Sequence, residues 1–357
     1  MASSGGPPSD WLIAGVPASG ASGGPIRARH IFAVLAQRTG AKTIAAHGRR
    51  GLPRLAMALA AGSGGWRRPL TLASTQLVPR PGLALLRGAV RPLVLDVHDH
   101  PALQADGLRI PLADARRQDL ERLFARNVAA FSKLVVPSPS FAELCGLPAE
   151  RIIVVTNGTD SEQVIPRPAP AEPVVGMVSG AAPGRGIELL LNAMARVRAE
   201  IPEATLRLAL TATGPASARY LRALASQLRE RDPWVTLNEV PYNRLSAFLG
   251  DASVLVIPHP PGPYMDASTP VKLFDSMSAG RPLAVTPRLE TRKIVEACGS
   301  GLVAASDSPD DLAEAILKLL RSESLRRELG ENARRCAVER YDWRVLSAGL
   351  ADAILRS

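Results

Sequence analysis

An alternation of short apolar runs with helical segments fills nearly the whole chain and limits its possible folds most. The apolar runs 11–17, 93–100 and 173–180 are each followed by a stretch with apolar residues at helical spacing. Strands that alternate with helices are typical of parallel sheets with helices on both faces. The sequence therefore predicts an α/β protein.

The alternation is interrupted once, by the proline-rich stretch 165–173. Such a stretch cannot form a central strand, so we place a domain boundary there. Residues 1–165 and 166–342 are then two similar α/β domains, and a helix over 343–357 crosses back to the first. Two doubly wound domains imply a ligand cleft between them, at the carboxyl ends of the strands.

Composition excludes several other classes of protein. Hydrophobic residues make up 46% of the chain and charged residues 21%, which is the usual globular mixture. The three cysteines (Cys145, Cys298 and Cys336) form no CxxC pair, which favours a reducing compartment and disfavours a structural zinc site. No apolar run approaches the ~18 residues of a membrane-spanning helix, and the first ten residues lack the features of a secretory signal. We expect a cytoplasmic protein.

Positive charge is concentrated in the first half. The net charge is +10, and residues 1–160 carry 19 Lys and Arg against 10 Asp and Glu. The region 11–95 contains no acidic residue and 12 basic ones. Basic side chains among apolar ones suit an anionic partner, such as the inner face of the cell membrane, on which the protein would sit peripherally. The alternative is an ordinary solvated, arginine-rich surface. Nucleic acid is disfavoured, because interleaved aromatic residues and recognition motifs are missing.

Three motifs follow one another in a specific order. Residues 157–160 read NGTD, a glycine loop runs from Gly180 to Gly186 before a helix, and residues 269–282 read TPVKLFDSMSAGRP. With these motifs the chain resembles the retaining glycosyltransferases of family 4 over nearly its whole length. The resemblance implies the GT-B fold, in which two Rossmann-like domains face each other across a cleft. It also implies transfer of a sugar from a nucleotide-diphosphate sugar, bound by the second domain, to an acceptor bound by the first.

The glycine loop has the chemistry that a diphosphate needs. Backbone N–H groups at a helix N-terminus, helped by the helix dipole, can hold phosphate oxygens and stabilise developing charge. Gly180, Gly184 and Gly186 form such a loop, and the guanidinium of Arg185 is expected to meet the same oxygens.

A second helix start is expected to reach the same anion. Thr269 and Pro270 open this helix, and Lys272 lies in its first turn. As in the family, the two cations would take the place of a metal ion. No DxD motif or His/Cys cluster is present, so we predict no metal site and no cofactor.

The resemblance assigns the donor sugar and its ribose to the same region. Asp275 stands where the family uses a carboxylate, usually Glu, to bind the ribose hydroxyls. The family's second Glu, eight residues earlier, is replaced by Ala267, and Asp266 substitutes for it if the loop shifts by one residue. Ser268 is a further expected donor contact. Met177 replaces an arginine that the family has.

The first domain contributes its own expected contacts. Gly23, Gly24 and Arg27 correspond to the family's N-terminal glycine-rich loop, near the leaving diphosphate. In the DVHDH stretch, His98 corresponds to a histidine that contacts the transferred sugar, and Asp99 lies beside it. Neighbouring residues of a strand alternate between faces, so the sequence leaves open which of His98, Asp99 and His100 faces the cleft. In the second domain, Tyr242 is expected either to flank the base or to lie in a surface turn.

Three functions remain in competition. The first is metal-independent, retaining transfer by front-face displacement, in which the departing diphosphate takes the acceptor proton and the protein supplies positioning and charge. Its acceptor is lipid-linked or anionic, as in cell-envelope glycan synthesis, or a soluble small molecule. The second is an epimerase or hydrolase that needs no acceptor. The third is a catalytically degenerate scaffold, which the loss of the family's first Glu keeps open.

Overall fold

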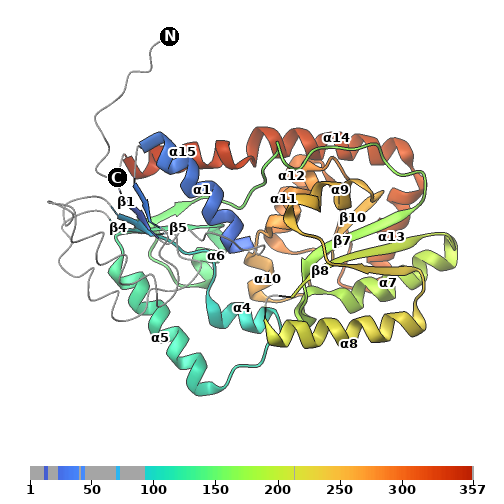
Figure 1. Cartoon of the computed structure of the whole chain (residues 1–357), viewed down its shortest axis with the longest axis horizontal. Coiled ribbons are helices and arrows are strands. Elements are labelled where there is room, and N and C mark those ends of the chain that lie inside the picture. The colour runs from blue at the N-terminus through green and yellow to red at the C-terminus, as the bar shows by residue number, and fades with distance from the viewer. Residues whose placement is uncertain are drawn as a thin grey trace, which may run out of the picture. The chain divides into compact units, whose positions relative to one another are not determined.

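Each half of the chain builds its own parallel sheet. The computed structural model describes residues 12–14, 23–39, 42–44, 70–72, 93–212 and 214–355 (Figure 1). The first unit takes its described residues from Met1–Gln104, Leu112–Thr156 and Trp343–Ser357, and the second from Ala105–Pro111 and Asn157–Asp342. The division falls before Asn157, where the prediction puts it after residue 165. The intervening residues hydrogen-bond within the second unit, as Asn157 does with Thr269.

The sheet of the first unit has six parallel strands in the order β2-β1-β3-β4-β5-β6. They are β1 (Leu12–Ala14), β2 (Lys42–Ile44), β3 (Leu70–Leu72), β4 (Leu93–Asp96), β5 (Lys133–Val136) and β6 (Ile152–Val154). Its helices are α1 (Gly23–Thr39), most of α4 (Pro101–Gly107), α5 (Asp114–Ala130), α6 (Pro139–Leu144) and α15 (Trp343–Leu355), with a 3-10 turn, η2, at Ala149–Arg151. As expected, the last helix packs on the first: α15 lies along α1, and Trp343 stacks on His30 with ring centroids 5.9 Å apart (Figure 1).

The sheet of the second unit has the order β12-β11-β10-β7-β8-β9, which is the strand order of a Rossmann fold. Its strands are β7 (Val174–Gly180), β8 (Thr205–Thr211), β9 (Val235–Asn238), β10 (Val254–Ile257), β11 (Leu283–Val285) and β12 (Gly301–Val303). Every residue of β10 and β11 is buried. This explains their unbroken apolar sequences, because a central parallel strand is covered on both faces.

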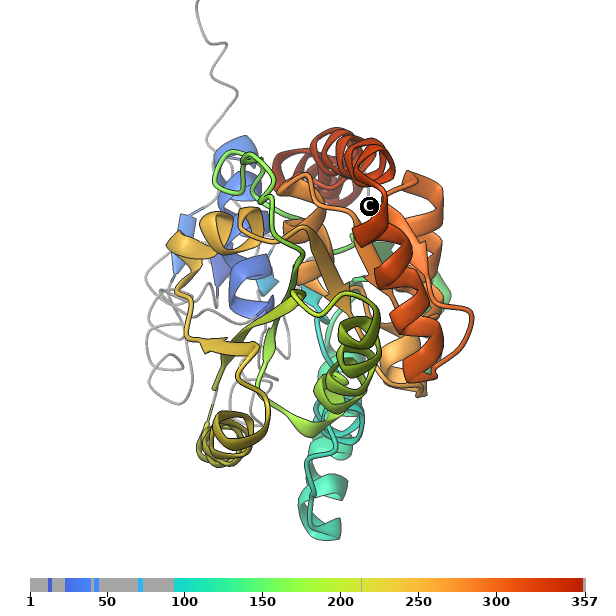
Figure 2. The same cartoon turned by 90° about the vertical axis from the view of Figure 1, so that its right-hand side faces the viewer.

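Helices cover both faces of the second sheet. One core cluster joins α7 (Ile187–Glu200), α8 (Pro215–Arg231) and α13 (Pro309–Arg321) to one face, where α7 and α13 lie side by side (Figure 2). The other cluster joins α9 (Leu245–Gly250), α11 (Val271–Ser278), α12 (Leu289–Cys298) and α14 (Glu323–Arg340) to the opposite face. The loops that leave the strand ends are thereby held on a rigid three-layered support.

Two segments differ from the sequence prediction. The expected strand 93–100 ends at Asp96, because residues 97–100 lead directly into α4. The expected loop 260–269 contains the short helix α10 (Pro263–Ala267), and the short 3-10 turns η3 (Pro183–Arg185) and η4 (Tyr242–Arg244) were not predicted either. Short turns of this kind carry too few residues for a periodic signal.

Two of the three cysteines are paired. Cys298 at the end of α12 and Cys336 on α14 form a disulfide with a Cα–Cα separation of 5.8 Å. The sequence predicts a reducing compartment and gives no sign of this pairing. The two residues are 38 positions apart in the chain, and their proximity arises only from the packing of the two helices. Cys145 is free, and burial raises the pKa of its thiol to about 12.

Candidate functional site

The second sheet has one point at which the strand order reverses, between β7 and β10. These strands are neighbours, but the chain continues from β7 toward β8 on one side and from β10 toward β11 on the other. Ligands of such sheets bind at the carboxyl ends of the strands where this reversal leaves a crevice. The loops at this place are the glycine loop after β7 and the segment that follows Ile257 at the end of β10.

Gly186 brings these two loops together. Its φ is +75°, and a Cβ at this position would lie 1.7 Å from the carbonyl oxygen of Pro258. Only glycine permits both the left-handed backbone and this approach. Helix α7 begins at the next residue, so its N-terminus is fixed against the segment that follows β10.

Gly184 has a different role from the predicted one. Its N–H donates to the carbonyl oxygen of Leu108 at 3.1 Å, and a Cβ on Gly184 would lie 2.1 Å from the carbonyl oxygen of Gly107. The glycine therefore accommodates the backbone of the segment Ala105–Pro111, and its N–H is not directed at an open site. By contrast, a Cβ on Gly180 would meet nothing within 4 Å.

Arg185 and Lys272, the two predicted cations, are brought close enough to influence each other. Burial lowers the pKa of Lys272 most strongly, Asp275 partly restores it, and Arg185 lowers it again. In the part of the chain that the structure describes, Nε of Arg185 is buried and has no hydrogen-bond partner. Arg185 and Lys272 thus lie near each other, and Lys272 has one neighbouring carboxylate that partly offsets its burial.

Asp275 is that carboxylate. Its side chain is fully buried on α11, and Oδ1 accepts a hydrogen bond from the Thr159 hydroxyl at 2.9 Å. Among the described residues, Oδ2 has no partner. Burial raises the pKa of Asp275 to about 6, although Lys272 and the Thr159 hydroxyl act in the opposite direction. One carboxylate oxygen is therefore fixed and the other is left for a further donor.

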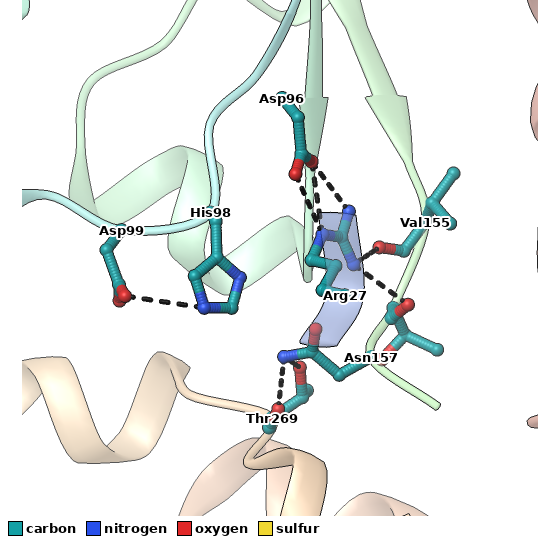
Figure 3. A network of polar contacts seen from close by, with 8 residues as sticks. Arg27, Asp96, His98, Asp99, Val155, Asn157 and Thr269 are labelled. Atoms are coloured by element: carbon teal, nitrogen blue, oxygen red, sulfur yellow. Dashed lines mark hydrogen bonds and ion pairs between the residues drawn. The ribbon is translucent and has the colours of Figure 1, made fainter. Parts of the chain in front are cut away.

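The NGTD motif positions the start of α11. The side-chain amide of Asn157 donates to the carbonyl oxygen of Thr269 at 2.6 Å, which Figure 3 shows. Pro270 is the N-cap residue of α11, with Lys272 in the first turn. The motif and the helix it supports lie more than 100 residues apart in the chain, so the sequence gives no direct sign of this contact.

His259 belongs to the same region, and the sequence analysis missed it. It lies two residues after the end of β10, only 4% of its surface is exposed, and its Nδ1 has no hydrogen-bond partner among the described residues. Burial, Arg185 and Arg288 together lower its pKa to about 3. A titratable residue just after a buried strand at the reversal of strand order was the available signal.

Asp266 does not take the place of the missing glutamate. Its carboxylate accepts from Nη1 of Arg288 at 3.2 Å, and Nη2 of the same arginine donates to Asp307 at 2.5 Å. Arg288 is 4% exposed, so these two carboxylates balance a buried charge. The hydroxyl of Ser268, a predicted donor contact, donates to the carbonyl oxygen of Tyr264 at 2.5 Å and closes α10.

Tyr242 lies away from the reversal of strand order. It opens η4 after β9, the edge strand of the sheet, and packs against the core cluster of α9 and α11. The glycine loop follows β7, and β8 lies between β7 and β9. Tyr242 therefore follows a strand two positions away from the one that leads into the glycine loop.

In the first unit, Arg27 is the centre of a buried network (Figure 3). Its side chain is fully buried; Nη2 bonds Oδ1 of Asp96 at 3.0 Å, and Nε lies within 3.2 Å of both carboxylate oxygens. Nη1 donates to the carbonyl oxygens of Val155 at 2.7 Å and Thr156 at 3.0 Å. The predicted donor contact is thus a cation with its own carboxylate, which ties α1 to the ends of β4 and β6.

The choice among the residues after β4 is partly resolved. The ring of His100 packs on Phe124, with centroids 4.1 Å apart, so this histidine is directed into the first unit. Nε2 of His98 lies 3.4 Å from Oδ2 of Asp99, and Gln104 donates to the same oxygen at 2.7 Å. Nδ1 of His98 is buried and has no partner within the described part of the chain.

The remaining predictions lie largely beyond what the structure describes. Gly23 and Gly24 form the first turn of α1. Most of the basic region 11–95 lies outside the described residues. Within the described ranges, no cluster of three His, Cys, Asp or Glu side chains could hold a metal ion. No helix of those ranges combines the length and the apolar character needed to cross a membrane.

Part of the chain is similar to a known family and to curated proteins. Residues 172–322 match the family described as glycosyl transferases group 1. The MMP alpha-(1->4)-mannosyltransferase of Mycolicibacterium hassiacum is 28% identical over 274 residues, which are 72% of this chain and 63% of that protein. The chain thus spans less than two thirds of this relative's length. An uncharacterized glycosyltransferase of Methanocaldococcus jannaschii is also 28% identical, over 29% of this chain and 27% of its own length.

Solved structures share the fold across nearly the whole chain. Sucrose-phosphate synthase from Thermosynechococcus elongatus has a TM-score of 0.75 at 18% identity and covers 97% of this chain and 98% of its own. Anabaena HepE in complex with UDP-glucose has a TM-score of 0.71 at 15% identity, with 97% and 100% covered. Residues 172–322 thus resemble the group 1 glycosyl transferases, and the solved neighbours show that the chain has the GT-B fold.

Proposed function

We propose that this protein transfers a sugar, with retention of configuration and without a metal ion, from a nucleotide-diphosphate sugar to an acceptor. The observation that carries the proposal is the pair Arg185 and Lys272, which lie close enough at the reversal of strand order for Arg185 to lower the pKa of the buried Lys272. Two mutually repelling, poorly solvated cations are the arrangement that a diphosphate stabilises. The solved neighbour HepE was crystallised with UDP and with UDP-glucose.

The binding energy in this proposal comes from charge and from helix ends. The diphosphate lies between the start of α7 and the start of α11, where unpaired N–H groups and the helix dipoles favour anions. Arg185 and Lys272 supply the positive charge that a divalent cation would otherwise provide. Asp275 receives the ribose hydroxyls through Oδ2, the oxygen that Thr159 leaves free.

The chemical step is a front-face displacement. The bond from the anomeric carbon to the diphosphate oxygen breaks as the bond to the acceptor oxygen forms on the same face. The acceptor proton passes to the departing diphosphate, so no protein group has to act as nucleophile. The protein lowers the barrier by holding both reactants and by stabilising the charge that develops on the diphosphate. His98 and Asp99 are the first-unit residues proposed to contact the transferred sugar.

The proposed acceptor is anionic or lipid-linked and binds the first unit. The charge difference between the halves of the chain supports this choice, because the region 11–95 contains 12 basic residues and no acidic one. A solved neighbour, WaaG, is a glycosyltransferase involved in lipopolysaccharide biosynthesis. Sedimentation with vesicles at moderate salt tests the choice: equal binding to neutral and anionic vesicles contradicts it and leaves a soluble acceptor.

Thermal unfolding with UDP-, GDP-, dTDP- and ADP-sugars tests the donor site. A ligand at 100 times its Kd adds about 2.7 kcal/mol to the native state, which is a readily measured rise in Tm. We expect one base to raise Tm and Arg185→Ala/Lys272→Ala to weaken its binding at least about 100-fold, since each hydrogen bond to a charged group contributes about 1.5–3 kcal/mol.

The matched control is Arg292→Ala/Lys318→Ala, which removes the same two charges from exposed positions on α12 and α13. It should bind as wild type does. No response to any nucleotide sugar contradicts the proposal. Tight binding without turnover, even with extracted acceptors, identifies a degenerate scaffold, and turnover that needs no acceptor identifies a hydrolase or an epimerase.

A further inference from the structure

The backbone of His259 is firmly held, although Nδ1 of its side chain has no partner among the described residues. Its carbonyl oxygen accepts from the Thr286 hydroxyl at 2.6 Å, and the preceding residue, Pro258, abuts Gly186. Only 4% of the residue is exposed, and Nδ1 has no hydrogen-bond partner among the described residues. A buried nitrogen without a partner costs stability. In a segment as firmly anchored as this one, such a nitrogen indicates a missing ligand.

The neighbours of His259 define what that ligand is. Arg185 from the glycine loop and Arg288 from the end of β11 both repel a proton on the imidazole, so the ring stays neutral. The charge of Arg288 is balanced by Asp266 and Asp307, although its Nε, like that of Arg185, is buried and has no hydrogen-bond partner among the described residues. A cation is excluded beside these guanidinium groups, and an apolar group would leave Nδ1 unsatisfied. An anionic group with acceptor oxygens satisfies both residues.

We propose that His259 donates an uncharged hydrogen bond from Nδ1 to the diphosphate of the bound donor, as a third side-chain contact beside Arg185 and Lys272. The inference rests on the proposed function and names one further residue of its donor site. It also accounts for Met177, a buried core residue of β7 where the family has an arginine. The third contact comes from the segment after β10 instead of from β7.

This role predicts opposite effects on stability and on binding. Replacing His259 with leucine removes the buried nitrogen that has no partner, so the ligand-free protein should be as stable as wild type or more so. The same change should weaken diphosphate binding about tenfold, which corresponds to one hydrogen bond to a charged acceptor. A residue with a purely structural role would lower Tm and leave binding unchanged.

The test is calorimetric titration of wild type, His259→Leu and His259→Asn. The probes are inorganic pyrophosphate, the nucleoside diphosphate whose sugar conjugate raises Tm most, and that conjugate. We expect His259→Leu to weaken all three probes by a similar factor. His259→Asn should bind within about threefold of wild type, because its amide nitrogen takes nearly the position of Nδ1. The ratio between wild type and His259→Leu should be equal at pH 6 and pH 8, since the imidazole is neutral at both.

Each other outcome has a definite meaning. If His259→Leu weakens only the sugar conjugate, the residue contacts the sugar and the inference is wrong. The inference also fails if His259→Leu binds all probes as wild type does. If wild type itself binds neither pyrophosphate nor any nucleoside diphosphate, both the proposed function and this inference are wrong.

Discussion

Two buried arginine clusters, one in each unit, differ in how their charges are matched. In the first unit, the guanidinium of Arg27 meets the carboxylate of Asp96 and two backbone carbonyl oxygens. In the second unit, Arg185 has a buried Nε without a partner in the described structure, and it repels Lys272 and His259. Both arginines follow a glycine-containing stretch after a strand, and the sequence predicts both near the diphosphate.

The difference distinguishes an arginine with a structural role from an arginine that binds a ligand. A buried charge with a full set of partners is already satisfied and would have to lose them to meet a ligand. Two cations that repel each other, one of which has a buried nitrogen without a partner among the described residues, store unfavourable energy that an anion releases. We therefore assign Arg27 to holding α1 against β4 and β6, and Arg185 to the donor. The predictions below test that assignment.

The largest expected effect is on the first cluster. Arg27→Met leaves the Asp96 carboxylate buried without its cation and should lower the free energy of unfolding by about 3–5 kcal/mol. Arg27→Met/Asp96→Leu removes both charges and should recover most of that loss. Urea unfolding followed by circular dichroism measures both. The structural role of Arg27 is contradicted if Arg27→Met is as stable as wild type but binds the donor nucleotide less tightly.

The second prediction concerns Asp275 and pH. Its pKa is about 6 in the folded protein and 3.8 as the ordinary value, so the folded state holds the proton more tightly. The free energy of unfolding should therefore fall as pH rises from about 4 to 6, by about 3 kcal/mol from this group. Asp275→Asn cannot titrate, so the difference between wild type and Asp275→Asn should change across this window.

Urea unfolding between pH 4 and 8 checks the Asp275 prediction. Glu314→Gln neutralises an exposed carboxylate on α13 and should give a curve parallel to that of wild type. If the curve of Asp275→Asn is also parallel to that of wild type, the buried carboxylate of Asp275 is as well satisfied as that of Asp96. The two units would then not differ in how their buried charges are matched.

A smaller effect is expected from Thr159, whose hydroxyl donates to Asp275. Thr159→Val should cost about 1–2 kcal/mol of stability at pH 7 and raise the pKa of Asp275 further, because that bond favours the ionised form. Thr159→Ser keeps the hydroxyl and serves as the matched control. Equal stabilities of the valine and serine variants would show that the bond contributes nothing.

The smallest effect belongs to an exposed pair. Arg122 and Asp119 lie 2.8 Å apart on α5, and both side chains are more than half exposed. Arg122→Ala should change the free energy of unfolding by less than about 0.5 kcal/mol, because water and salt screen such pairs. A loss comparable with that of Arg27→Met would mean that burial is not what distinguishes the arginine clusters.

The sequence was sufficient for features that depend on local pattern. Strand and helix alternation predicted both sheets, and the order of the motifs indicated the family and the region around Lys272. Gly186 was found because a glycine before a helix leaves a local trace. Its contact with Pro258 explains why no other residue fits, but this contact leaves no trace in the local sequence.

Features that depend on long-range contacts were not predictable. The role of Gly184 depends on Leu108, a residue of the first half of the chain that belongs to the second unit. Arg27 was expected to contact a ligand, but its ion pair with Asp96 gives it a structural role. His259 carries no motif, and only its burial between two arginines makes it notable. In each case the partner, not the residue itself, decides the role.

The pairing of α1 with α15 has a consequence for biosynthesis. A ribosome releases α1 early, but the partner that covers it, with Trp343 against His30, is translated only after the entire second unit. Domains usually fold in the order in which they emerge. Here the first unit stays incomplete while the second finishes, so nascent chains that stall before residue 343 should expose the apolar face of α1 to chaperones.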